Sequence, residues 1–167
     1  HETSSSAYLD FGYTLNSFDF TTCLFDKNLI AFTPDNSDAL EFLLYRANQR
    51  TGKNQLYRFE MNANGVFTLQ SEKANSWMPQ NVKDVKIIDF IRKGTINNSK
   101  DEDLGFSAKV SVPWLLIGGY PDKDEKFKIH MRHRYKDVNK EYPFATVESI
   151  QGENSDNPET WLSVSFE

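Results

Sequence analysis

The chain has 167 residues, of which 38% are hydrophobic and 14% aromatic, enough apolar material for one domain with a single core. Its formal net charge of −5 disfavours a nucleic-acid-binding protein, which usually carries a surplus of basic residues. No apolar run approaches the ~18 residues of a transmembrane helix, so we expect no membrane-spanning segment. The single cysteine, Cys23, excludes an intrachain disulfide, and its apolar neighbours suggest a small buried side chain.

Short apolar runs, separated by turn residues, follow one another along the whole chain at intervals of about 8–14 residues. The candidate strands are 7–13, 20–25, 28–33, 39–46, 54–61, 66–70, 82–91, 105–112, 126–135, 144–150 and 160–166. No segment shows a sustained helical period with caps, although 82–91 is ambiguous. We therefore predict one all-β domain over residues 1–167, an antiparallel β-sandwich of two sheets with about ten strands.

Two hairpins stand out within this series. The run 55–61 alternates apolar and polar residues, and Asn64-Gly65 then supplies the positive φ of a tight turn before 66–69 returns. A second hairpin joins 40–46 to 55–61 through a polar loop.

The strand at 105–112 has the clearest alternation in the sequence. It follows an acidic, asparagine-rich loop and ends at Pro113, which has no N–H to donate. One face carries Phe106, Ala108, Val110 and Val112, and the other carries Ser107, Lys109 and Ser111. We expect this strand at the centre of the sandwich with the apolar set in the core.

Two regions offer side chains suited to a ligand. Trp77 lies in the polar stretch 74–81, where an indole is either a platform for a ligand or a plug at the edge of the core. On strand 127–135, four polar side chains share one face, which is either a ligand surface or a solvated sheet face: Lys128, His130, Arg132 and Arg134. Trp114 and Trp161 are expected in the core, and Tyr120, Tyr135 and Tyr142 lie near loops that could line a site.

The acidic loop is a candidate metal site. Asp101 and Asp103 alternate, and Asn97 precedes them, so that these oxygens could hold calcium. The alternative is a solvated acidic turn. No other cofactor is expected.

Several motifs, in the same order along the chain, resemble those of the family 9 carbohydrate-binding modules. The loop and strand at 94–114 are similar to the family's Gly-Thr-Leu-Asn, Asp-x-Asp-x-Gly-Trp and Ile-Pro-Trp signature. Segments 38–43, 57–65, 127–132 and 157–164 also resemble family strands, and Trp77 lies where the family often has a tryptophan. The resemblance implies a β-sandwich with a non-catalytic sugar-binding role, often beside a glycoside hydrolase or in a secreted lipoprotein, and often braced by calcium.

The sequence departs from the family pattern at Phe106, where the family has tryptophan, and at Lys109, where it has glutamate. The expected function is a carbohydrate-binding module, accessory to glycan degradation, that binds a saccharide outside the cell or in the cell envelope. The candidate ligand residues are Trp77, Arg132, Arg134, His130, Arg58 and Lys109.

Three alternatives stay open. The first is a structural or protein-interaction sandwich that has lost its sugar site. The second is a haem-binding relative with Met78 and either His130 or His133 as axial ligands. The third is a glycoside hydrolase, because any two carboxylates ~5–9 Å apart can catalyse glycoside hydrolysis and a sequence does not reveal such a pair. The sequence contains no motif of another catalytic class.

Overall fold

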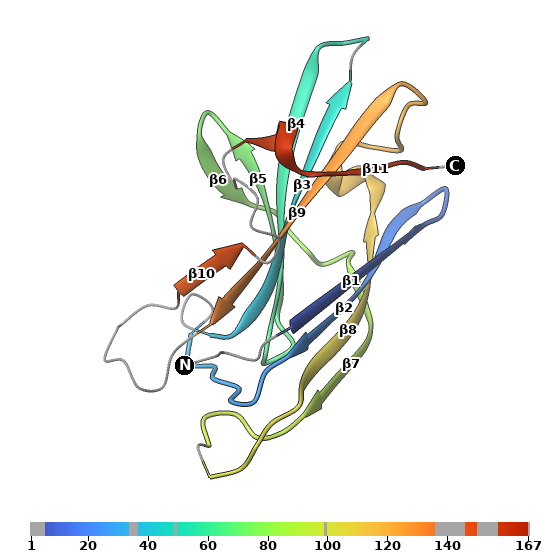
Figure 1. Ribbon diagram of the computed structural model, residues 1–167. Helices are drawn as coiled ribbons and strands as arrows, with labels where there is room; N and C mark the ends of the chain where they lie inside the picture. The colour runs from blue at the N-terminus through green and yellow to red at the C-terminus, as the bar shows by residue number, and fades with distance from the viewer. Residues whose placement is uncertain are drawn as a thin grey trace.

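A computed structural model describes residues 6–33, 37–48, 50–98, 100–135, 146–149 and 157–166. It shows two antiparallel sheets that lie as separate layers (Figure 1). The four-stranded sheet has the order β1 (Ser6–Tyr13), β2 (Ser17–Phe25), β8 (Gly105–Pro113) and β7 (Lys86–Lys93). This arrangement confirms the predicted all-β sandwich.

The second sheet has seven strands. Its order is β10 (Thr146–Ser149), β9 (Glu125–Tyr135), β3 (Ala39–Asn48), β4 (Lys53–Asn62), β5 (Phe67–Lys73) and β6 (Ser76–Pro79), and β11 (Leu162–Val164) also pairs with β9. β10 and β11 pair with opposite ends of β9. The described helical segments are two short 3₁₀ turns, η1 (Trp114–Ile117) and η2 (Pro158–Thr160). Among the described residues, no helix has the length and apolar character to cross a membrane.

The core lies between the sheets and is rich in aromatic rings. Phe18 and Phe20 of β2 face Phe42 of β3 and Phe59 of β4, and the Phe42 and Phe59 rings stack at 4.5 Å. All four are buried, which removes their large apolar surfaces from water. Trp114 joins the same cluster, as the sequence predicts.

The prediction for strand 105–112 is confirmed. β8 pairs with β2 on one side and β7 on the other, so it is an inner strand of its sheet. Phe106, Ala108, Val110 and Val112 are each at most 4% exposed and belong to the core. Alternation decides this because successive side chains of a strand point to opposite faces.

Some strand predictions were wrong in their bounds. The predicted strand 28–33 forms only an isolated bridge between Ala31 and Ser37. The strand expected from residue 82 begins at Lys86. The preceding segment Ser76–Pro79, expected to be loop, is strand β6 of the other sheet.

The cysteine is less buried than its apolar neighbours in the sequence suggest. Cys23 is only half-buried and lies opposite Tyr8 and Ser107 on the outward side of β2.

Both predicted hairpins are present. β3 pairs with β4, and β4 pairs with β5 through the turn at Asn64-Gly65, where Gly65 has φ 79°. This positive φ is the conformation that glycine adopts without steric cost. The two turns therefore place β3, β4 and β5 side by side, which builds the middle of the seven-stranded sheet.

Candidate carbohydrate-binding face

The seven-stranded sheet has an outer face, meaning the side chains that point away from the four-stranded sheet. On β9, Phe127 and Ile129 enter the core, so Lys128, His130, Arg132 and Arg134 lie on the outer face. The predicted grouping of these four residues on one face is thus correct. On β4, the core residues Tyr57 and Phe59 alternate in the same way with Arg58 and Glu60.

The register brings residues from four strands into two neighbouring rows on this face. One row contains His130, Leu43, Arg58 and Gln70, from β9, β3, β4 and β5 in that order. The next row contains Arg132, Glu41, Glu60 and Thr68 from the same strands. Residues far apart in the sequence thereby form one largely polar face, in which some side chains are buried and others exposed.

Two ion pairs with buried carboxylates hold the second row in place. The Arg132 guanidinium donates to a Glu41 carboxylate oxygen. The Arg134 guanidinium donates to both oxygens of Glu60, at 2.8 and 2.7 Å, in the bidentate arrangement typical of strong arginine–carboxylate pairs. Glu41 and Glu60 are at most 8% exposed, so the two carboxylates act as a fixed base beneath their arginines.

Trp77 lies on β6 opposite Glu72, at the far side of the sheet from β9. Its indole ring lies 4.7 Å from the guanidinium carbon of Arg58, and Arg58 also donates to Gln70. The indole is half-buried and is absent from the core cluster. Trp77 is therefore a surface aromatic, held by a cation–π contact on one of its two faces.

Trp161, which the sequence places in the core, lies on the outer face instead. Its ring stacks on His130 with centroids 5.5 Å apart and meets Tyr45 edge-on at 6.5 Å. Nearby, Lys128 pairs with Glu159 at 3.2 Å and so helps to fix the segment that carries Trp161. Although Trp161 is buried as expected, its partners are polar-face residues, because η2 and β11 place this segment against β9.

The sequence missed Trp161, Glu41, Glu60 and Gln70 as members of this face. Glu60 occupies a polar position in the alternating run 55–61, and Glu41 is the one charged residue in the apolar run 39–45; these were the available signals. Such signals indicate a face but do not indicate which strands lie next to one another.

Lys109 is not brought together with the other candidates. It lies on β8 in the four-stranded sheet, opposite Thr21 and Asp89, and it is exposed. Tyr120 packs edge-on against Trp114 at 5.9 Å, and Tyr135 lies beside His133 on the core side of β9. Tyr142 lies outside the described residues.

The acidic loop is braced by its own side chains. Asp103 is buried and accepts hydrogen bonds from the backbone N–H groups of Leu29 (2.7 Å) and Thr95 (2.8 Å). Asn97 exchanges two hydrogen bonds with the backbone of Ala31, and Asp101 accepts one from the Thr95 hydroxyl. These contacts give the loop a structural role without a metal, and the calcium site stays a prediction.

The haem alternative does not fit the topology. Met78 lies on β6 and both histidines lie on β9, with β5, β4 and β3 between them. Four strand spacings correspond to about 19 Å across the sheet. His130 and His133 also point to opposite faces of β9. Neither histidine can therefore share an iron atom with Met78.

Solved structures share this fold. A family 9 carbohydrate-binding module from Caldicellulosiruptor kristjanssonii, in complex with glucose, has a TM-score of 0.57 and 13% identity over 98% of this chain and 77% of that chain. A family 9 module from the same organism, in complex with cellotriose, has a TM-score of 0.55 and 14% identity over 98% of this chain and 75% of that chain. A protein from Bacteroides uniformis, to which carbohydrate binding is provisionally ascribed, has a TM-score of 0.63 and 14% identity over 98% of this chain and 79% of that chain.

No family model and no curated protein sequence matches the chain. The family resemblance of the motifs and the similarity of the solved structures nevertheless agree on one architecture. The protein has the β-sandwich fold of the family 9 carbohydrate-binding modules.

Proposed function

We propose that this protein is a non-catalytic carbohydrate-binding module that holds a saccharide on the outer face of its seven-stranded sheet. The observation that carries the proposal is the group formed by Trp77, Arg58 and Gln70, with Arg132 in the neighbouring row. These four side chains are partly exposed, whereas Glu41, Glu60 and His130 beneath and beside them are buried. A ligand would therefore meet an aromatic ring and polar groups that are already positioned.

The chemistry of these groups suits a neutral sugar. A pyranose ring presents flat C–H surfaces that pack on an indole, and since the Arg58 guanidinium lies over one face of Trp77, the sugar would take the other face. Arginine N–H groups and the glutamine amide provide fixed donors and acceptors for neighbouring hydroxyls. The ion pair of Arg132 with Glu41 and the contacts of Arg58 reduce the conformational entropy that these side chains would lose on binding.

Glucose and short β-glucans are the first ligands to test, because the similar Caldicellulosiruptor module was solved with glucose and with cellotriose. Glu41 and Glu60 are each paired with an arginine and nearly inaccessible, which favours binding over hydrolysis at these two carboxylates. An accessory role beside a glycoside hydrolase, outside the cell or in the cell envelope, is the setting that the motif resemblance supports.

We expect Trp77→Ala to weaken saccharide binding about thirtyfold, because loss of a stacking aromatic costs on the order of 2 kcal/mol. Its stability should change little, since the indole lies outside the core cluster. Isothermal titration with glucose and cellotriose measures the affinity, and a thermal melt measures the fold. Tyr8→Ala is the matched control, because Tyr8 is an exposed aromatic on β1 of the other sheet.

Two results would count against the proposal. If Trp77→Ala keeps its fold and its affinity, the saccharide site lies elsewhere on the protein. If the unaltered protein binds no member of a broad glycan panel, the alternative of a structural or protein-interaction sandwich is favoured instead.

A further inference from the structure

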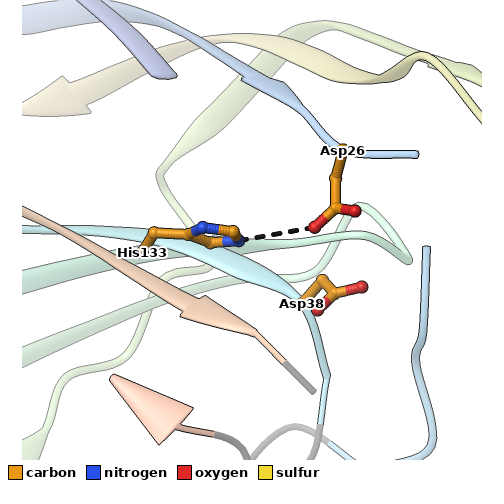
Figure 2. A group of neighbouring side chains, drawn as sticks. All are labelled: Asp26, Asp38 and His133. Atoms are coloured by element: carbon orange, nitrogen blue, oxygen red, sulfur yellow. Dashed lines mark ion pairs between the residues drawn. The ribbon is translucent and has the colours of Figure 1, made fainter. Parts of the chain in front are cut away.

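Asp26, Asp38 and His133 lie close together at one end of the sandwich, away from the outer face. One ligand atom from each residue lies within 4.8 Å of those of the other two. Figure 2 shows the three side chains converging from separate segments, with the His133 ring directed toward Asp26. Asp38 is 0% exposed and His133 is 5% exposed, whereas Asp26 is half-buried and opens the cluster toward solvent.

The topology explains why these residues meet. Asp26 follows β2 of the four-stranded sheet, Asp38 precedes β3, and His133 lies on β9 opposite Leu40 of β3. His133 shares the core side of β9 with Ile129 and Met131, since it is separated from them by even numbers of residues. The cluster therefore spans the two sheets where the chain crosses from β2 to β3.

The separation of His133 and Asp26 fits two ligands of one ion better than a direct hydrogen bond between them. His133 Nε2 and Asp26 Oδ2 are 3.7 Å apart, beyond the usual hydrogen-bond range of about 2.7–3.2 Å. Nitrogen and oxygen ligands of one tetrahedral zinc ion, each about 2.0–2.2 Å from the metal, are separated by about 3.3–3.5 Å. Small side-chain rotations would bring the atoms to that spacing.

The backbone holds both carboxylates in place. Asp26 Oδ1 accepts from the N–H of Asn28 at 3.0 Å, so Oδ2 is the oxygen that faces His133. Asp38 Oδ2 accepts from the N–H of Ile30 at 2.6 Å, and the Asp38 backbone bonds to Ile30 and Ala63.

We infer that Asp26, Asp38 and His133 form a binding site for a zinc-like divalent transition metal that fastens the two sheets together. The imidazole nitrogen suits zinc and related transition metals and the two carboxylate oxygens are also possible zinc ligands, whereas calcium prefers oxygen ligands only. Three protein ligands leave one position for water, which can enter on the side of Asp26. The site is separate from the acidic loop residues Asp101 and Asn97, and it does not depend on saccharide binding.

The test is titration of the chelator-treated protein with zinc chloride, followed by calorimetry and thermal melting. We expect one zinc ion per chain at this site and a melting temperature raised by about 5–10 °C when zinc exceeds its Kd about 100-fold. Cobalt should give the visible d–d absorbance of a low-coordinate nitrogen–oxygen site. Calcium at the same concentration should neither displace the bound cobalt nor raise the melting temperature.

Two variants and one control make the assignment specific. Asp26→Asn and His133→Gln should each lower zinc affinity at least about 100-fold, since even the loss of a group that only supports a metal ligand costs 10–100-fold. Asp124→Asn, which changes an exposed carboxylate elsewhere, should bind zinc normally. Circular dichroism and the metal-free melt confirm that each variant folds, and Asp26→Asn preserves the acceptor for Asn28.

Three results would overturn the inference. They are the absence of zinc binding to the unaltered chain, zinc binding that neither substitution weakens, and displacement of zinc by an equal concentration of calcium.

Discussion

Replacement of Arg46 by methionine is expected to lower the free energy of unfolding by about 3–5 kcal/mol. Arg46 is 1% exposed, and its guanidinium pairs with Glu125 at 2.8 Å and also donates to the backbone carbonyls of Ile117 and Gly119. The same group lies 4.9 Å from the Phe127 ring. Methionine fills much of the volume, but it leaves the Glu125 carboxylate, which is 9% exposed, without its cation.

Urea denaturation of both proteins measures this loss, and Arg50→Met is the matched control. Arg50 pairs with Asp122 at a similar distance, 3.0 Å, but its side chain is 69% exposed. Exposed ion pairs contribute about 0–1 kcal/mol, so the control should change little. Equal effects of the two substitutions would mean that the Arg46 network contributes no more than a surface pair.

Replacement of Gly105 by alanine is expected to lower the free energy of unfolding by about 3–5 kcal/mol, from backbone strain and steric overlap together. Gly105 has φ +119°, which residues with side chains rarely adopt. A Cβ there would lie 1.8 Å from the carbonyl oxygen of Leu24, so β2 and β8 would have to move apart. Phe106, the next residue, is part of the core and would shift with them.

Two other glycines separate the causes of this loss. Gly52 has φ +67° with nothing near its absent Cβ, so Gly52→Ala should show the backbone strain alone, about 1 kcal/mol. Gly12 has neither a positive φ nor a close neighbour, and Gly12→Ala should be neutral or slightly stabilising. Thermal or urea unfolding of the three variants should rank them in this order. A Gly105→Ala protein as stable as Gly52→Ala would show that the strands absorb the overlap.

Local pattern was enough to predict the fold class. The alternation at 105–112 determined which side chains of β8 face the core, because a strand has a side-chain period of two. Asn64-Gly65 determined a tight hairpin, because few other residues adopt positive φ without strain. The polar face of β9 was predicted for the same reason as the core face of β8.

Composition was a weaker guide where tertiary contacts decide. The segment around Trp77 is polar and contains few strand-forming residues, yet it forms β6 because β5 offers an edge for pairing. The segment 28–33 is apolar, but it crosses between the sheets and forms a single bridge with Ser37. Arg46 lies in an alternating strand at a core position, and burial of its charge depends on Glu125 from a distant strand.

The sequence by itself determined the alternating strands, the turns between them and the two faces of each strand. Only the tertiary structure decided which faces meet. Strand order placed Arg58, Gln70 and Trp77 beside one another and Lys109 on the other sheet. The crossing from β2 to β3 brought Asp26 and Asp38 to His133. The physical reason is that alternation is a local property of the backbone, whereas strand pairing depends on the burial and hydrogen bonding of segments that are distant in the chain.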